Sequence, residues 1–186
     1  MNATDRPTIR RADTADAAVL AAIGAATFIE TFGHLYAPED LAAFLAATYS
    51  RAACARLLAD PGVAVWLAGP AQHPTGYVVA GPCKLPVPDR EPRAGEIRQL
   101  YLHRSAQGRG LGTRLLQVAL DWLRANGHTP LYVGVWSENL GAQRLYARHG
   151  FGKIGEYDFP VGRHLDREFI LKQSTPAMKH LAGLQS

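Results

Sequence analysis

The spacing of hydrophobic residues in the first third of the 186-residue chain predicts helices. Leu20, Ile23 and Thr27 recur at intervals of three and four residues, which places them on one face of a helix. Asp13 or Thr14 before them offers an N-cap. The two segments that follow are rich in Ala and Leu. The elements predicted here are a strand at 7–11, helices at about 14–28, 39–49 and 51–59, and a turn at 60–62.

Beyond residue 62 the period changes from that of helices to that of strands. Val63, Val65 and Leu67 alternate with their neighbours, as the residues of a half-buried strand do. Gly127 and Gly150 suit the ends of two later helices. We expect strands at 63–68, 76–80, 96–103, 131–136, 154–159 and 166–172, and helices at 110–125 and 139–149.

The order of these elements predicts a mixed sheet. The strand–helix–strand–helix unit at 96–149 implies a parallel pair of strands joined through a helix. The hairpin-like pairs on either side of this unit imply antiparallel neighbours. We find no repeat and no low-complexity linker. We therefore expect one α/β domain over residues 1–186, with a core at about 5–172 and a tail at 173–186.

The composition is that of a soluble globular protein, with 47% hydrophobic and 19% charged residues. No apolar run approaches the roughly 20 residues that cross a bilayer. Residues 1–6 lack the basic-then-apolar layout of a secretory signal. Cys54 and Cys83 form no CxxC motif, so we expect reduced thiols. These features favour a cytoplasmic protein that does not bind a membrane.

Cationic residues gather in a part of the chain that has no acidic residue. The formal net charge is +4, and no Asp or Glu lies between Glu96 and Asp121. Such a run suits an anionic ligand, or it consists of ordinary solvated cations. No basic stretch alternates with aromatic residues, so we expect no nucleic acid partner. The seven histidines form no HxH or HExxH motif, so we expect no metal. The cations of the run are Arg98, His103, Arg104, Arg109 and Arg114.

A glycine-rich loop joins the strand predicted at 96–103 to the helix after it. Glycines let backbone N–H groups turn toward one point, and the helix N-terminus adds partial positive charge. The loop is therefore a candidate phosphate site, although such a turn can also be purely structural. Thr113-Arg114 replaces the Lys-Ser/Thr of a Walker loop, and G-x-G-x-G differs from the dinucleotide fingerprint. The loop sequence is Gln107-Gly108-Arg109-Gly110-Leu111-Gly112.

This loop and a later block together resemble the GNAT acetyltransferase superfamily. The loop fits the superfamily signature Q/R-x-x-G-x-G/A and follows Leu100-Tyr101-Leu102. The similarity covers about Glu96 to Lys172, and two ordered motifs are more specific than either one alone. The later block consists of Val135-Trp136-Ser137-Glu138-Asn139, Ala142, Leu145-Tyr146 and Gly150-Phe151.

The resemblance implies a mixed, strongly twisted sheet of about six or seven strands, with splayed fourth and fifth strands, flanked by helices. It implies acetyl-CoA as cosubstrate, with the pantetheine arm between those strands and the pyrophosphate on the loop. Asn139, Ala142 and Tyr146 stand at i, i+3 and i+7, and the small Ala142 leaves space for a slender ligand. The expected cofactor-binding residues are Leu100, Tyr101, Leu102, Gln107, Gly108, Arg109, Gly110, Leu111, Gly112, Thr113, Asn139 and Ala142.

The chemistry implied is direct attack of a neutral amine on the thioester. In the family pattern Tyr146 is the general acid that protonates the leaving thiolate, although a single tyrosine is more often a packing residue. An alkylammonium must lose its proton first. Glu96, at the start of the fourth strand, is our first candidate for the base, and Glu30 and His164 follow it. An ordinary solvated or ion-paired role is at least as common for each of the three.

The acceptor side is predicted from aromatic and acidic residues near the end of the first helix and in the closing hairpin. In this superfamily these regions commonly roof the acceptor pocket, and aromatic walls with carboxylates suit a cationic amine. Aromatic residues of an ordinary core are the alternative. We expect an N-acetyltransferase for a small amine or polyamine, similar to the bacterial spermidine/spermine-type branch. A protein N-terminal or lysine acetyltransferase and a non-catalytic acyl-CoA sensor stay open, as does a homodimer. The expected acceptor-binding residues are Phe28, Glu30, His34 and Tyr157.

Overall fold

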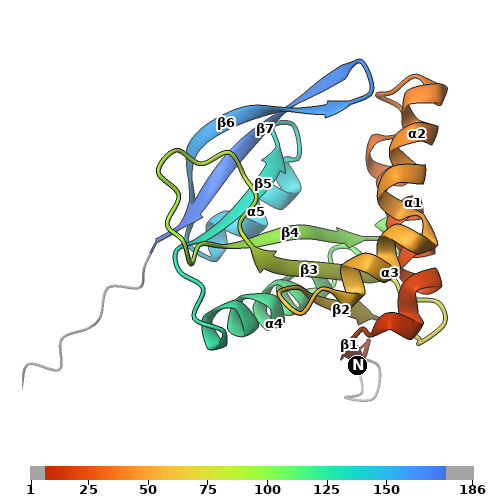
Figure 1. Ribbon diagram of the computed structural model, residues 1–186, viewed down its shortest axis with the longest axis horizontal. Helices are drawn as coiled ribbons and strands as arrows, with labels where there is room; N and C mark the ends of the chain where they lie inside the picture. Colours follow the sequence, from red (N-terminus) through yellow and green to blue (C-terminus); the bar gives the residue numbers. More distant parts are fainter. Residues whose placement is uncertain (1–6, 175–186) are drawn as a thin grey trace, which may run out of the picture.

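The computed structural model describes residues 7–174, which form a seven-stranded sheet flanked by helices (Figure 1). The strands lie in the order β1-β2-β3-β4-β5-β7-β6. The neighbours are antiparallel except for the parallel pair β4 and β5. The predicted fold class, a mixed sheet of six or seven strands, is confirmed. The elements are β1 (Ile9–Arg11), the 3-10 helix η2 (Thr14–Asp16), α1 (Ala17–Phe32), α2 (Pro38–Tyr49), α3 (Arg51–Ala59), β2 (Ala64–Ala68), β3 (Gly76–Pro82), β4 (Gly95–Leu102), the 3-10 helix η3 (Arg104–Ala106), α4 (Leu111–Ala125), β5 (Leu131–Trp136), α5 (Leu140–Arg148), β6 (Phe151–Val161) and β7 (His164–Gln173).

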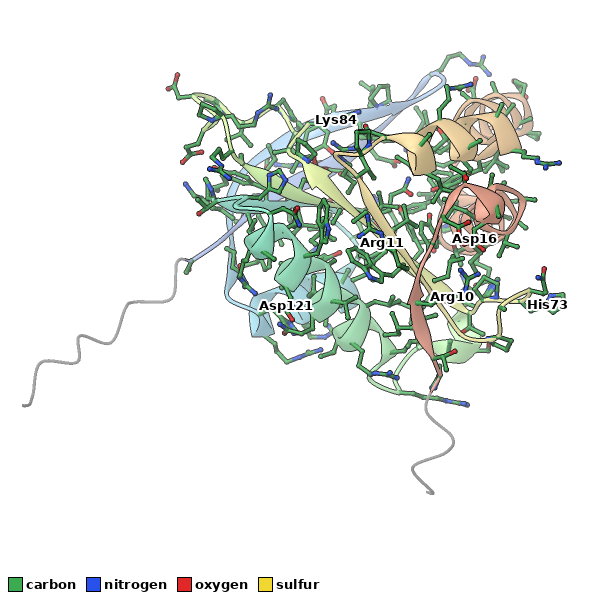
Figure 2. The ribbon with its side chains drawn as sticks, turned by 60° about the horizontal axis from the view of Figure 1, so that its bottom comes forward. Arg10, Arg11, Asp16, His73, Lys84 and Asp121 are labelled. Atoms are coloured by element: carbon green, nitrogen blue, oxygen red, sulfur yellow. The ribbon has the colours of Figure 1, made fainter. Side chains whose placement is uncertain are left out.

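A capping box fixes the start of the first helical segment. The Asp13 side chain accepts a hydrogen bond from the backbone N–H of Ala15, and the Asp16 side chain accepts one from the backbone N–H of Asp13. Arg10 of β1 pairs with Asp16 at 2.6 Å, and Figure 2 shows the two side by side. The hydrogen bonds from Arg10 lower the pKa of Asp16. This ion pair links the edge strand β1 to the 3-10 turn that precedes α1.

The stretch Thr14–Phe32 is long and apolar enough to pass a length-and-composition test for a membrane span. The expectation that no apolar run reaches such a length was therefore wrong for this stretch. In the fold it packs against α2, α3 and the sheet, and its residues Leu20, Ile23 and Phe28 are each at most 4% exposed. It is a core helix, because its apolar face meets other parts of the protein.

The helices cover the sheet in two layers, and β3 shows which side chains meet which layer. Val78 and Ala80 pack toward α4, whereas Tyr77 and Val79 pack toward α1. This alternation follows from the period of two in a strand. All four residues are at most 1% exposed, because helices lie on both faces.

At the edge of the α4 layer, a cation packs against two tryptophans that also contact each other. The Arg11 guanidinium lies 4.8 Å from the ring of Trp66 and 5.3 Å from the ring of Trp122. The two indoles themselves meet edge to face, with centroids 6.1 Å apart. This arrangement joins β1, β2 and α4 through cation–π contacts.

Strands β4 and β5 pair over only a short length. Residues 95–97 pair with residues 131–133, and beyond Ile97 no residue of β4 pairs with a residue of β5. Strand β5 continues instead alongside β7, where Trp136 stands opposite Glu168. The predicted splay between the fourth and fifth strands is therefore present.

The hairpin of β6 and β7 is longer than predicted and reaches across to α2 (Figure 1). Pro160 and Val161, predicted as part of the turn, belong to β6, and the chain reverses at Gly162 with φ +57°. Arg163 donates hydrogen bonds to Asp40, near the start of α2. Gln173, predicted to begin the tail, ends β7, and residues 175–186 lie outside the described part.

Candidate active site

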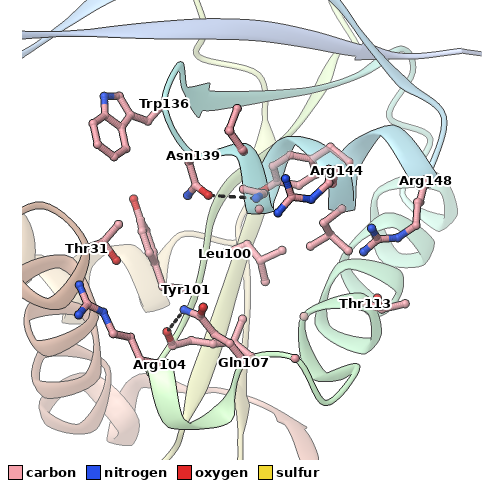
Figure 3. A pocket seen from close by; sticks show the side chains of 18 of the residues that line it. Thr31, Leu100, Tyr101, Arg104, Gln107, Thr113, Trp136, Asn139, Arg144 and Arg148 are labelled. Carbon is pink, nitrogen blue, oxygen red and sulfur yellow. Dashed lines mark hydrogen bonds between the residues drawn. The ribbon is translucent and has the colours of Figure 1, made fainter.

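The splay between β4 and β5 opens a cavity of about 850 Å³ (Figure 3). Side chains from β4, the glycine loop, β5 and α5 surround it, so its walls come from elements on both sides of the split. The lining residues are Thr31, Leu100, Tyr101, Leu102, Arg104, Gln107, Gly108, Gly110, Gly112, Thr113, Trp136, Glu138, Asn139, Leu140, Gly141, Ala142, Arg144, Leu145, Tyr146 and Arg148.

The glycine loop presents backbone at the N-terminus of α4. Gly108 and Gly110 have φ values of +74° and +78°, a left-handed conformation that glycine adopts without steric cost. A β-carbon at either position would meet no atom within 4 Å, so the surface there is open. Gly110 is the N-cap. Because glycine has no side chain, the first N–H groups of α4 have no side-chain cap. These donors and the helix dipole give the loop the chemistry to bind an anion.

Hydrogen bonds from two directions hold this loop in place. The Gln107 side chain donates to the carbonyl of Leu102 at 3.2 Å. The Glu30 carboxylate accepts from the backbone N–H of Arg104 at 3.0 Å and lies 2.8 Å from Nδ1 of His103. Glu30, predicted as acceptor-binding or as a base, thus ties the end of α1 to the residues before the loop. It is not among the residues that line the cavity.

Helix α5 brings three predicted residues to the cavity wall. Asn139 is its N-cap, and the Asn139 Oδ1 accepts from the backbone N–H of Ala142 at 3.0 Å (Figure 3). This bond orients the side chain and leaves its amide N–H groups for a ligand. Asn139, Ala142 and Tyr146 all line the cavity, as their shared helix face predicts.

Tyr146 is 5% exposed, and its hydroxyl makes no hydrogen bond within residues 7–174. Its ring meets Phe151 edge to face, with centroids 5.9 Å apart. Burial, and next the negative charge of Glu168, raise the pKa of Tyr146 well above its usual range. The phenol therefore keeps its proton at neutral pH and can donate it into the cavity.

Two arginines that the sequence analysis did not single out stand on the cavity rim. Arg144 and Arg148 lie one turn apart on α5, and Figure 3 shows both beside the opening. Their spacing of four residues could have identified them as neighbours on the helix surface. Among the predicted cofactor residues, Arg109 and Leu111 do not line the cavity, and Leu111, the first residue of α4, points into the core at 3% exposure.

The remaining predicted residues lie outside the cavity lining. Phe28 stacks on Phe44 in the core between α1 and α2, at a centroid distance of 4.5 Å. His34 is exposed. Glu96 is 7% exposed, and its Oε2 accepts from the backbone N–H of Lys84 at 2.7 Å. Burial raises the pKa of Glu96.

Two carboxylates that the sequence analysis missed lie on β7, on the sheet face that α4 and α5 do not cover. Glu168 accepts a hydrogen bond from the hydroxyl of Tyr157 at 2.7 Å. The side chain of Tyr157, predicted to bind the acceptor, therefore points toward Glu168. Asp166 accepts one from the hydroxyl of Tyr36 and lies 3.2 Å from Nε2 of His164, a further predicted base. Their alternating positions in β7 were the available signal.

Known proteins resemble this chain over most of its length. The model of the acetyltransferase (GNAT) family matches residues 28–151. An N-acetyltransferase of Lactobacillus delbrueckii subsp. lactis is 33% identical over 82% of this chain and 88% of its own length. One of Mycobacterium bovis is 32% identical over 84% of this chain and 96% of its own.

Solved structures share the fold. The PaiA N-acetyltransferase of Thermoplasma acidophilum, in complex with coenzyme A, has a TM-score of 0.71 at 16% identity. The match covers 91% of this chain and 99% of that one, and at this identity it shows the fold alone. YncA of Salmonella typhimurium, solved with its cofactor acetyl-CoA, has a TM-score of 0.62 at 28% identity over 91% of this chain and 94% of that one.

Proposed function

Because the chain belongs to the acetyltransferase (GNAT) family, we propose that it transfers the acetyl group of acetyl-CoA to the primary amine of a small molecule. The observation that carries this proposal is a cavity with cations in one wall and carboxylates behind its other end. Arg144 and Arg148 line the cavity from α5, whereas Asp166 and Glu168 do not line it but lie on β7, where Glu168 stands opposite the lining residue Trp136. An anionic cofactor and a cationic acceptor suit these ends.

The residues of the first end fit the nucleotide part of acetyl-CoA. The N-terminus of α4 supplies backbone donors for a pyrophosphate, and the open glycines 108 and 110 let it approach. Arg144 and Arg148 supply cations for further phosphate. Beyond Ile97, β4 has no strand partner on its β5 side, so its backbone groups there are free to pair with an amide-containing arm. When bound, acetyl-CoA supplies an activated thioester.

Tyr146 is the general acid in this proposal. Its side chain is largely buried and lines the cavity, and its protonated hydroxyl makes no hydrogen bond within residues 7–174, so it can protonate a thiolate as that group leaves. A free backbone N–H near Tyr101 can polarise the thioester carbonyl. Trp136 and Tyr101 form an aromatic wall beside the reacting centre, and Phe32 packs on both rings.

The surroundings of the acceptor end favour a small molecule over a folded protein. The hairpin of β6 and β7 is joined to α2 by the hydrogen bonds from Arg163 to Asp40, and to the α1–α2 connection by the bond from Tyr36 to Asp166. These contacts bridge the two elements that border the acceptor end. A slender amine passes such a boundary more readily than a protein surface does. Cys54 and Cys83 are both free, buried thiols, and we propose the cytoplasm as the location.

A thiol-release assay with acetyl-CoA tests the function. The acceptors are polyamines, other alkylamines, amino acids, and peptides with free N-termini or lysines. We expect a small amine to give saturable release of CoA and an acetamide product seen by mass spectrometry. Turnover with peptides alone would assign the chain to protein acetylation. Binding of acetyl-CoA without transfer to any acceptor would make it a sensor.

A further inference from the structure

We propose that Glu168 is the group that binds the acceptor's ammonium and takes its proton before attack, an inference that rests on the proposed amine acetylation. It replaces Glu96 in that role. The grounds are the position of Glu168 over the opening of the split strands, the absence of a cationic partner, and the face of the sheet on which it lies.

The position of Glu168 follows from strand register and from a glycine. Glu168 stands opposite Trp136 on β5 and opposite Tyr157 on β6. Its Oε2 reaches over Gly134, where an added β-carbon would lie only 2.9 Å from it. Gly134 immediately follows Val133, the last residue of β5 that pairs with β4. The carboxylate therefore stands where the two strands begin to separate.

No cation in the described part of the chain neutralises this carboxylate. Within residues 7–174, no Lys, Arg or His nitrogen lies within ion-pair distance of Glu168, and its hydrogen-bond partner is the Tyr157 hydroxyl. Burial, with Asp166 and Glu96 as negative neighbours, raises the pKa of Glu168. A half-buried carboxylate among like charges gains from a cationic ligand. The titratable groups that face it or act on it are Asp166 of β7, Glu96 and Tyr101 of β4, Tyr146 of α5, Tyr157 of β6 and Tyr36 of the α1–α2 connection.

The face of the sheet separates the acceptor from the cofactor. Leu131, Val133 and Val135 of β5 pack toward α4 and α5, whose residues border the proposed cofactor end. Trp136 points to the other face, and Glu168, which is paired directly opposite Trp136, points to that face too. An amine that approaches from this face meets Glu168 without crossing the proposed cofactor end.

Glu96 is less suited to receive the amine than Glu168. Its Oε2 accepts a hydrogen bond from the backbone N–H of Lys84 at 2.7 Å, and Glu96, like Glu168, lies outside the cavity lining. It belongs to the paired part of β4, before the split. Glu96 therefore acts on the site through its charge, which adds to that around Glu168.

The proton transfers balance as follows. The Glu168 carboxylate takes one proton from the ammonium and later releases it to water. The neutral nitrogen attacks the thioester carbon, the C–S bond breaks, and Tyr146 gives its proton to the sulfur. The nitrogen's second proton restores Tyr146. The net products are an acetamide, a free thiol and one proton.

The experiment compares Glu168→Gln with Glu96→Gln, and uses Glu156→Gln as a charge control, since Glu156 pairs with Lys153 on the outer strand of the same hairpin. With the best acceptor found, we expect E168Q to lower kcat/KM for the amine about 100-fold at pH 7. The loss should shrink as the pH rises toward the amine's own pKa, because free amine no longer needs a base. Glu168→Asp should recover part of the rate, and the KM for acetyl-CoA should not change.

A binding measurement gives a readout that does not depend on turnover. Calorimetry with n-butylammonium and the CoA-loaded protein should show binding to wild type and to E156Q, and at least tenfold weaker binding to E168Q. Equal binding by E168Q, an unaltered pH profile, or a larger loss in E96Q overturns the proposal, as does wild-type protein that binds no n-butylammonium. If E168Q matches wild type while transfer proceeds, only this inference fails. If wild type acetylates no acceptor, the proposed function fails.

Discussion

The cofactor end and the acceptor end that we propose are built by different means, with arginines in the cavity wall at the first and carboxylates behind the second. The cofactor end uses backbone N–H groups of one loop and side chains of one helix, all within residues 107–148. The acceptor end uses carboxylates of β7 that reach the split only through pairing with β5 and β6. Binding at the first end depends on the local geometry of one loop and one helix. Binding at the second end depends on correct register between strands that are distant in sequence.

The two ends also differ in their effect on folding stability. The open glycines of the loop cause no strain, because their φ values suit glycine. Burial, with Asp166 on the same strand face, disfavours the charged form of Glu168. Folding therefore opposes the charge of Glu168 at the proposed acceptor end.

The largest effect should come from Tyr146, which stands between the two ends. Tyr146→Phe keeps the ring contact with Phe151 and removes the proton donor. We expect kcat to fall by about 100-fold or more, with unchanged affinity for acetyl-CoA. Steady-state kinetics with calorimetry checks both values. Tyr49→Phe is the control, because the Tyr49 hydroxyl bonds to Tyr77 in the core. A wild-type kcat in Tyr146→Phe would assign the acid to another group.

The next effect should single out the cofactor end. Gly110→Val and Gly150→Val place the same side chain at φ +78° and +79°, and neither β-carbon would meet an atom within 4 Å. Each should cost about 1–2 kcal/mol of folding stability. Only Gly110→Val should weaken CoA binding, by roughly tenfold or more, the equivalent of about 1.4 kcal/mol. Thermal melts and calorimetric titration separate the two effects. Equal affinity losses would contradict the phosphate site.

A smaller effect should come from the exposed arginines of the same end. Replacing both Arg144 and Arg148 with Ala should weaken acetyl-CoA binding by about fivefold, since exposed ion pairs contribute up to about 1 kcal/mol each. The loss should diminish at high salt and be absent with acetyl-pantetheine, which lacks the nucleotide phosphates. Arg124→Ala, at the far end of α4, is the matched control. An equal loss with acetyl-pantetheine would remove these residues from phosphate binding.

The smallest effect concerns stability at the acceptor end. The folded state raises the pKa of Glu168, so its contribution to stability is fully present below the unfolded pKa and is lost as the pH rises through the folded one. Glu168→Gln, which stays neutral, should therefore melt higher than wild type at pH 8 and lose this advantage near pH 4. The expected gain is a few degrees, since about 1 kcal/mol corresponds to roughly 2–4 °C in a domain of this size. A lower melting temperature at pH 8 would show that the carboxylate stabilises the fold.

Local patterns were sufficient for the elements and for the residues of the glycine loop and α5 that line the cavity. The helix predicted at 51–59 and the strand at 131–136 have the bounds that the structure gives. The shared face of Asn139 and Tyr146 follows from helical spacing, and both line the cavity. Both depend on residues close in sequence, whose geometry the backbone period determines.

The acceptor end could not be predicted in the same way. Phe28 and Glu30 have the residue types of an acceptor pocket, but tertiary contacts decide their places. Phe28 fits between α1 and α2, and Glu30 finds donors in His103 and Arg104, more than seventy residues away. The register that puts Glu168 opposite Trp136 depends on the pairing of two strands separated by a helix and a third strand.

The tryptophan pair around Arg11 gives the protein a convenient optical property. Of the three tryptophans in the chain, Trp66 and Trp122 lie together at the edge of the α4 layer, and Trp136 alone lines the cavity. Replacing the first two with Phe leaves a single tryptophan, in the cavity wall opposite Glu168. Stopped-flow emission from that variant would report the order in which cofactor and amine enter, without any attached label.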